Sequence, residues 1–350
     1  SGKISFIVYT GALMDETIDE YIALSRKALF LGIPCFTSLD TATAATDIIA
    51  SHYTQQNTEL VDINNMRETR QVFEFSKMQA TGDDYIFIEN FDGRVTCPES
   101  LCVTLCDRHF GIGANGIVLL EKSQIADMKM RIFNTDGTEG EMAGNCIRCV
   151  AKYTYDNGYA EGRDTIRIET KLGVNEVKVY TSDGRVTYAT ASMGKPSLLA
   201  KDVPVNLPLE KVFNYPCVIV NHVYNLNCVS MGNPHCVVFC DSVDKIDLEV
   251  EGPKFEHHKI FPERVNTEFV RVVNDTMLKM RVYERGSGVT MACGTGACAA
   301  VVAACENGFC EKDTDITVKV PGGDLIVRYT DDDVTLSGDA KFVFKGLFEY

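Results

Sequence analysis

The sequence predicts an α+β protein with two pseudo-symmetric halves, each a β-sheet wrapped around a central helix, preceded by a small α/β segment. One observation is an internal repeat, since the chain matches itself at an offset of 150 residues without a gap. A second is the stretch Ala297 to Cys305, which is apolar on nearly every face, as expected of a buried helix. The matched blocks are 82–83 with 232–233, 130–134 with 280–284, 143–145 with 293–295, and 156–159 with 306–309.

The first 70 residues alternate strand and helix patterns, which is typical of an α/β segment. A β-branched apolar run comes first, and the helical spacing that follows it ends at Gly32. Polar residues then predominate up to Arg70, as in a linker. The predicted elements are a strand over 4–9, a helix over 15–31, a strand over 34–39, a helix over 41–52 and a linker over 54–70.

Each half of the repeat is expected to contain short strands, a glycine-containing turn and a long helix. The two helices should begin near residues 144 and 294 and end at Asn-Gly. The acidic run 331–333 is expected to be the tip of a hairpin. Strands that wrap the first helix are predicted over 84–88, 129–133, 165–169 and 186–191.

A chain of 350 residues is long enough for two or three domains at about 150 residues each. The change in composition near residue 70 and the repeat that follows it give the boundaries. We predict an α/β segment over 1–70, a first half over 71–192 together with 338–350, and a second half over 193–337.

The composition argues against several classes of partner. A formal charge of −15 repels nucleic acid and anionic membrane surfaces, and no apolar run approaches the roughly 20 residues of a membrane span. The 14 cysteines lie in apolar patterns and no signal peptide is evident, so we expect reduced thiols in the cytoplasm. Cys146 and Cys149 form a C-x-x-C without a second pair, so no metal site is expected.

Cys293 has a sequence context that favours chemistry. It directly precedes Gly294-Thr295-Gly296 at a predicted helix start, where backbone amides can bind a carboxylate and lower the pKa of a thiol. The repeat predicts a second helix start of the same kind. Two such helix N-termini facing one cleft would hold a substrate carboxylate between them. They would also place one acid–base group on each face of the neighbouring carbon, so that a proton can be removed from one side and delivered to the other.

Six sequence blocks form an ordered set between residues 73 and 350. They are KMQATGDDY (77–85), DRHFGIGANG (107–116), FNTDGTEGEMAGN (133–145), MGNPH (231–235), RVYERG (281–286) and ACGTGACA (292–299). Together they resemble the signature blocks of the diaminopimelate epimerases, in order and at similar spacing.

This resemblance implies an isomerase that needs no cofactor and in particular no pyridoxal phosphate. Its small-molecule substrate would be diaminopimelate, whose LL- and meso-forms the family interconverts in lysine and peptidoglycan biosynthesis. The implied mechanism uses two bases, a pair of cysteines. The resemblance also implies a homodimer in the bacterial cytoplasm.

Individual residues take their expected roles from the same resemblance. Cys293 corresponds to one of the paired cysteines. His235 and Glu284 correspond to groups beside the cysteines that assist proton transfer. The substrate-binding positions correspond to Gly144, Asn145, Gly294 and Thr295 at the two helix starts, and to Asn134, Asn233, Asn266 and Arg285 around the distal carboxylate and amine.

The other cysteine of the family is absent, because Ala143 stands in its place and a methyl group cannot carry a proton. Three accounts are open: an engineered substitution, a natural change in which Cys146 or a water takes the role, or a one-base relative with weak or altered activity. Cys146 is a possible substitute because it replaces a usually small residue three positions on, about one helical turn along.

Two further departures concern Asp83, where the family has Asn, and Asn115, where it usually has Asp. We include Asp83 among the substrate-binding residues. Its negative charge is expected to weaken carboxylate binding unless it faces the substrate amine.

The segment KALFLGIPCFTSLDTATA (27–44) resembles the methylglyoxal-synthase-like regulatory domain of the carbamoyl-phosphate synthase large chain. Only about half of such a domain is present. We therefore expect an appendage with a dimer or docking role rather than an effector site.

Two other functions remain open. One is a diaminopimelate-binding protein without turnover, which binding without proton exchange would identify. The other is a proline-racemase-like enzyme or dehydratase of the same fold. Asn266 and Arg285 argue against this last function, because a small cyclic substrate has no second carboxylate for them to bind.

Overall fold

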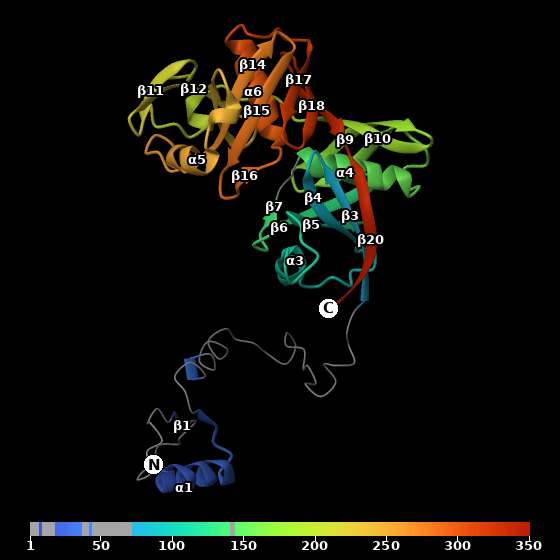
Figure 1. Ribbon diagram of the computed structural model, residues 1–350. Coiled ribbons are helices and arrows are strands. Elements are labelled where there is room, and N and C mark those ends of the chain that lie inside the picture. The colour runs from blue at the N-terminus through green and yellow to red at the C-terminus, as the bar shows by residue number, and fades with distance from the viewer. Residues whose placement is uncertain (1–6, 9–17, 37–41, 44–71, 141–143) are drawn as a thin grey trace. The chain divides into compact units, whose positions relative to one another are not determined.

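The computed structural model describes residues 7–8, 18–36, 42–43, 72–140 and 144–350 (Figure 1). Its contacts divide the chain into two compact units, Ser1–Arg70 and Gln71–Tyr350. The predicted linker and most of the predicted helix over 41–52 lie outside the described residues, as does Ala143. No helix within the described ranges combines the length and the hydrophobicity needed to cross a bilayer.

The described part of the first unit is a small β-α-β arrangement. Helix α1 (Ile18–Phe30) connects strands β1 (Ile7–Val8) and β2 (Cys35–Phe36), which pair in parallel. Gly32 follows the helix at φ +64°, a conformation that glycine adopts without a steric penalty, so the chain can turn back there. The predicted α/β order is therefore present in this segment.

In the first half of the second unit, strands surround helix α4 (Gly144–Asp156) (Figure 1). The helix ends where the sequence predicts, since Gly158 follows it at φ +83° and Tyr159 N–H donates to Thr154 O. Neighbouring strands pair in the order β20-β3-β4-β5-β6-β8-β9-β10. Their bounds are β3 Val72–Ala80, β4 Asp83–Glu89, β5 Gly116–Glu121, β6 Met128–Asn134, β8 Thr165–Thr170, β9 Gly173–Ser182, β10 Arg185–Ser192 and β20 Lys341–Glu349, with the short β7 Glu139–Gly140 beside β6.

The second half repeats this arrangement around helix α6 (Gly294–Glu306), which is followed by Gly308 at φ +75°. Its strands pair in the order β11-β12-β13-β14-β15-β17-β18-β19, and β19 pairs with β10 to join the halves. Their bounds are β11 Tyr215–Ile219, β12 His222–Ser230, β13 Pro234–Phe239, β14 Asn266–Asn274, β15 Met277–Glu284, β17 Asp315–Val320, β18 Gly323–Tyr329 and β19 Val334–Asp339, with the short β16 Gly288–Thr290 beside β15.

The strand pairings confirm the predicted pseudo-symmetry. The parallel pair β4–β5 has its counterpart in β13–β14, and the parallel pair β6–β8 in β15–β17. Helices α3 (Pro98–Cys106) and α5 (Leu248–Glu256) also begin 150 residues apart, and the predicted hairpin tip joins β18 to β19. The short 3₁₀ segments are Ala200–Asp202 and Val243–Lys245.

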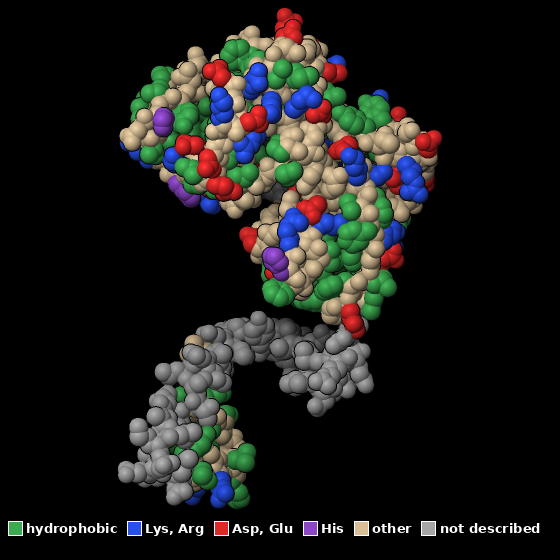
Figure 2. Space-filling model, in the orientation of Figure 1, with side chains coloured by type: hydrophobic (Ala, Val, Ile, Leu, Met, Phe, Trp, Pro, Cys, Tyr) green, Lys and Arg blue, Asp and Glu red, His purple; other side chains and the backbone are tan. Residues whose placement is uncertain are grey.

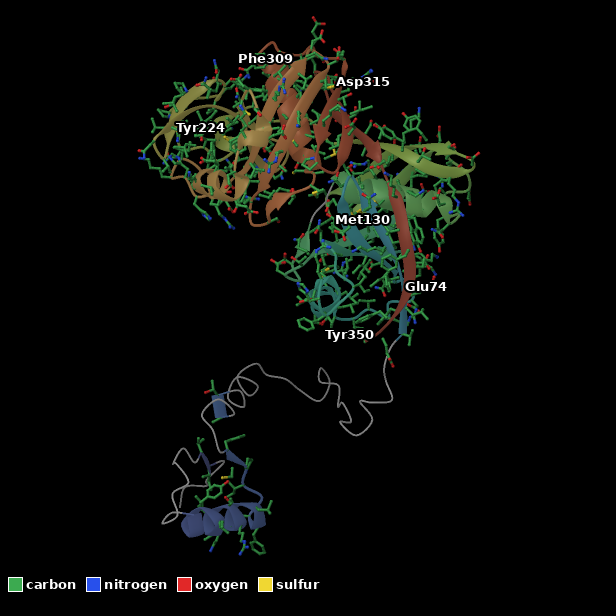
Figure 3. All side chains as sticks on the ribbon, in the orientation of Figure 1. Glu74, Met130, Tyr224, Phe309, Asp315 and Tyr350 are labelled. Carbon is green, nitrogen blue, oxygen red and sulfur yellow. The ribbon has the colours of Figure 1, made fainter. Side chains whose placement is uncertain are left out.

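Each central helix lies in its own hydrophobic core. Small side chains dominate α6, and all of them from Gly296 to Ala304 are buried, so the surrounding strands can approach the helix closely. In α4, Cys146 and Cys149 are fully buried and act as small core residues. Figure 3 labels Met130, which belongs to the same core.

Candidate active site

The N-termini of α4 and α6 meet. A Cβ on Gly294 would lie 3.6 Å from Gly144 Cα and 3.4 Å from Asn145 Oδ1, and a Cβ on Gly144 would lie 3.0 Å from Met193 Cε. A Cβ on Gly294 would also lie 2.9 Å from Leu336 Cδ2, so glycine at these two positions makes room for Leu336 and Met193 where the helix ends meet. Unpaired amides and helix dipoles at two adjacent N-termini favour a bound anion such as a carboxylate.

Cys293 caps α6. Its backbone is extended at φ −117° and ψ 115°, and Gly296 N–H donates to its Sγ at 3.4 Å. Thr295 Oγ1 lies 3.4 Å from the same sulfur. An N-cap side chain usually carries an oxygen that accepts this bond. A thiol in that role stands directly beside the helix amides.

The expected lowering of the Cys293 pKa is wrong. Burial raises the pKa of this thiol well above its usual value, and the nearby carboxylates of Glu284 and Glu268 raise it further. The bonds from Thr295 and the Gly296 amide lower the pKa but have smaller effects. The thiol is therefore protonated at neutral pH, and it must pass its proton to a neighbour before it can act as a base.

Glu284, the last residue of β15, is that neighbour. Burial raises the pKa of Glu284, hydrogen bonds from Thr290 and Cys293 lower it, and the charges of Asp83 and Glu268 raise it. Thr290 Oγ1 donates to Glu284 Oε1. A buried carboxyl with a raised pKa beside a protonated thiol is suited to proton exchange near neutral pH.

His235 begins a hydrogen-bonded chain that leads toward Cys293. Its Nδ1 lies 2.7 Å from Glu268 Oε1, and its Nε2 lies 2.9 Å from Asn233 Oδ1. Asn233 Nδ2 in turn donates to Thr295 Oγ1 at 3.3 Å. His235 and Glu268 are both fully buried, so the carboxyl fixes the orientation of the imidazole.

Sequence reasoning did not identify Glu268. This carboxyl lies in β14 between buried neighbours, its Oε2 has no hydrogen-bond partner among the described residues, and a Cβ on Gly296 would meet its Oε1 at 2.6 Å. The strand NTEFVRVVN also contains other polar residues, so the sequence offered no signal that this carboxyl is buried and needs a specific partner.

Asp83, the first residue of β4, accepts three hydrogen bonds from neutral donors. Tyr85 Oη and Asn145 Nδ2 donate to its Oδ2 at 3.0 and 3.2 Å, and Asn115 Nδ2 donates to its Oδ1 at 2.8 Å. Burial raises the pKa of Asp83 even though these bonds lower it. Asn145 Nδ2 also lies 3.4 Å from Ala292 O, so one amide connects Asp83 to the segment just before α6.

The residues expected around a distal carboxylate are connected in the second half. Asn266 Nδ2 donates to Pro234 O at 2.8 Å, and its Oδ1 accepts from Arg285 N–H at 2.9 Å. Asn134 ends β6 in the first half, where its Nδ2 donates to Thr138 Oγ1 at 3.1 Å. The contacts thus hold Asn266 and Arg285 together and hold Asn134 within its own turn.

Cys146 is the third residue of α4 and is fully buried in the first-half core. Burial raises the pKa of its thiol well above the usual value, and the charges of Cys149 and Asp83 add to this. The position argues against Cys146 as a substitute for the missing cysteine, because a fully buried thiol must move before it can touch a substrate.

Comparisons with known proteins agree with this arrangement. The family profile described as "Diaminopimelate epimerase" matches residues 75–199 and 227–343. A diaminopimelate epimerase of Acetivibrio thermocellus is 46% identical over 274 residues, covering 78% of this chain and 97% of the relative. One of Desulfovibrio desulfuricans is 43% identical over 280 residues, covering 78% and 96%.

Solved structures share the fold at low sequence identity. A PhzF-family phenazine biosynthesis protein of Bacillus anthracis has a TM-score of 0.59 at 16% identity, covering 79% of this chain and 99% of its own. A hydroxyproline epimerase of Agrobacterium vitis has a TM-score of 0.59 at 14% identity, covering 79% and 92%. The profile match and the identity to curated relatives establish the assignment: the chain belongs to the diaminopimelate epimerase family.

Proposed function

We propose that this chain is an isomerase that converts LL-diaminopimelate to meso-diaminopimelate at the α-carbon without a cofactor, in lysine and peptidoglycan biosynthesis. The observation that carries the proposal is the Cys293–Glu284 pair at the N-terminus of α6, directly beside the N-terminus of α4. Identities of 42–46% to several curated diaminopimelate epimerases support the substrate assignment.

In this proposal the substrate α-carboxylate binds the amides at the two helix N-termini, Gly144 and Asn145 on α4 and Gly294 and Thr295 on α6. When the Cα–H bond breaks, its electron pair delocalises into that carboxylate, and the amides stabilise the added charge. Cys293 serves one face of the α-carbon. Glu284 takes the thiol proton when Cys293 acts as the base and returns it when Cys293 acts as the acid.

The remaining polar residues would select a long diamino diacid. The Arg285 guanidinium is assigned to the distal carboxylate, because a guanidinium binds a carboxylate with two parallel hydrogen bonds. The distal carboxylate and amine are also assigned to the side chains of Asn134, Asn233 and Asn266. His235, oriented by Glu268, assists proton movement beside the site.

Chiral chromatography of a reaction started from LL-diaminopimelate tests this function. We expect the meso-form to accumulate and L-proline to remain unchanged. Tight binding of diaminopimelate without conversion would instead identify a binding protein, for which Ala143 is the sequence argument. Racemisation of proline alone would indicate a proline-racemase-like enzyme.

We also propose a cytoplasmic homodimer that associates through β20. Strand β20 pairs with β3 along one edge, and we assign its other edge, at which no pairing occurs among the described residues, to the contact with a second copy. Phe342 is 47% exposed and Leu347 is 73% exposed, and Figure 2 shows hydrophobic side chains over this part of the surface. Residues 1–70 are then an appendage that resembles part of the methylglyoxal-synthase-like domain, with a docking role outside the epimerase fold.

Removal of residues 1–70 is therefore expected to leave both conversion and dimerisation intact, because the site and β20 belong to the other unit. Sedimentation velocity and the chiral assay, applied to the full chain and to residues 71–350, measure both properties. Leu347→Lys in the full chain should produce monomers. A dimeric full chain with a monomeric 71–350 fragment would assign dimerisation to the appendage instead.

A further inference from the structure

We propose that Asp83 is the proton carrier on the face of the α-carbon that Cys293 does not serve. This inference rests on the proposed function and identifies the second of its two acid–base groups. The need for such a group is set by the sequence, since Ala143 has no ionisable atom. Asp83 lies in the site itself: Asn145 on the α4 N-terminus donates to its carboxyl, and the same amide reaches Ala292 beside α6.

The hydrogen bonds around Asp83 favour a carboxyl that can change its protonation state. All three donors, on Tyr85, Asn115 and Asn145, are neutral, so none of the bonds to this carboxyl comes from a cation. A carboxylate oxygen accepts two hydrogen bonds, and the contacts use both positions on Oδ2 and one on Oδ1. Oδ1 therefore has a position left for a proton.

Asp84, the next residue, provides a contrast within the same strand. It is paired with Lys77 and with Arg108, whose Nη2 lies 2.8 Å from Asp84 Oδ1, and these cations lower its pKa. Burial is the largest effect on both carboxyls and raises the pKa of each, but the two cations outweigh it at Asp84, whereas the neutral donors at Asp83 do not, so the pKa of Asp83 is raised. Adjacent carboxyls thus have different roles, one structural and one available for proton transfer.

Arg108 orients the Asn115 amide toward the Asp83 carboxyl. Arg108 Nη2 donates to Asn115 Oδ1 at 2.9 Å, which leaves Asn115 Nδ2 to donate to Asp83. The sequence resemblance gives Asn at 83 and usually Asp at 115. The two departures are therefore reciprocal, because they exchange an amide and a carboxyl across one hydrogen bond. With Asp at 83 and Asn at 115 the hydrogen bond between the two positions is kept. The negative charge then lies at position 83, in the site that lacks a cysteine, and no longer at position 115 beside Arg108.

Other groups near this face are less suitable. Cys146 is fully buried in the core, and both ring nitrogens of His235 are engaged, one by Glu268 and the other by Asn233. Asn145 and Tyr85 are neutral donors to Asp83. Among the described ionisable groups on this side, Asp83 combines a direct link to the α4 N-terminus with an available oxygen position.

The proton transfer balances without any further reactant. The Asp83 carboxylate takes the α-proton, and the electron pair of the C–H bond passes into the substrate carboxylate bound at the helix ends. The Cys293 thiol then donates its proton to the opposite face of the α-carbon and becomes a thiolate. After product release, Asp83 loses its proton to solvent and Cys293 regains one through Glu284. In the reverse direction Cys293 is the base and Asp83 is the acid.

Asp83→Asn tests the proposal, with conversion and α-proton exchange in D2O followed by NMR and chiral chromatography. General acid–base groups contribute factors of about 10²–10⁴, so we expect conversion to fall by at least about 100-fold. Cys293 remains, so one stereoisomer should still exchange its α-proton at the Cys293 face without inversion, while the other becomes inert. A structural role for Asp83 would slow exchange of both stereoisomers together.

The matched control is the double variant Asp83→Asn/Asn115→Asp. It keeps a hydrogen bond between the two positions and restores a carboxyl beside Arg108, so it should fold normally yet remain as inactive in conversion as the single variant. Adding Ala143→Cys to this double variant should recover conversion. Conversion that survives Asp83→Asn, or that the double variant restores, overturns the inference alone. A wild-type chain inert toward both stereoisomers overturns the proposed function and this inference with it.

Discussion

Cys293→Ala is expected to lower the conversion of LL- to meso-diaminopimelate by at least about 10³-fold, because it removes the acid–base group on one face entirely. Asp83 would remain as the only carrier. Proton exchange should then be confined to the stereoisomer whose α-proton faces Asp83, the reverse of the selectivity expected for Asp83→Asn. Initial rates from both stereoisomers, with NMR detection of α-deuterium, measure this.

Cys298→Ala provides the matched control for Cys293→Ala. Cys298 lies in the same helix and is fully buried in the second-half core, so its loss should affect packing and leave the proton-transfer groups in place. Cys293→Ser adds a second comparison, since a hydroxyl can accept the Gly296 amide bond but is a far weaker acid than a thiol. Equal conversion by the Cys293→Ala and Cys298→Ala variants would show that Cys293 takes no part in catalysis.

Arg148→Leu is expected to lower the free energy of unfolding by several kcal/mol, because hydrogen bonds from a charged donor contribute about 1.5–3 kcal/mol each. Arg148 is fully buried, and its guanidinium donates to Thr81 Oγ1 at 2.9 Å, Gly144 O at 3.2 Å and Asp339 O at 3.3 Å. These bonds tie together the turn after β3, the start of α4 and the junction of β19 with β20. Leucine would remove all three of these hydrogen bonds.

Urea unfolding of the 71–350 fragment measures this effect, with Arg185→Leu as the control. Arg185 is exposed at the start of β10, so its replacement should change the unfolding free energy by no more than about 0.5 kcal/mol. Because Arg148 also fixes Gly144, its replacement should weaken diaminopimelate binding in the fraction that remains folded. Equal midpoints for the two variants would contradict the structural role of the Arg148 network.

Much of the fold follows from the spacing of apolar residues. The 150-residue repeat predicted two halves, and the parallel pairs β4–β5 and β13–β14 show that the repeat extends to strand pairing. Helix ends were also predictable, because Asn157-Gly158 and Asn307-Gly308 provide the left-handed residue that ends a helix. Strand order was beyond reach, since β19 pairs with β10 from the other half and nothing local specifies that partner.

The site was less predictable because its chemistry depends on burial and register. A cysteine at a helix start suggested a lowered pKa, but burial and two carboxylates raise it. Glu268 was missed because the parallel register of β13 and β14 brings it to His235, and no sequence spacing encodes that register. The exchange of Asp83 with Asn115 was visible as two separate departures. Only the fold shows that the two residues are hydrogen-bonded, with Asn115 Nδ2 2.8 Å from Asp83 Oδ1.

The most direct test of the central claim is the early time course of LL-diaminopimelate with the full-length wild-type chain in D2O. If two separate groups carry the proton, the meso product should contain deuterium at the inverted α-carbon, while the recovered LL-substrate should contain almost none. The reason is that the group that delivers deuterium to the product is not the group that removed the proton from the substrate. Deuterium that appears in LL-substrate without any meso product would contradict a two-sided mechanism. A complete lack of exchange and conversion would contradict epimerase activity itself.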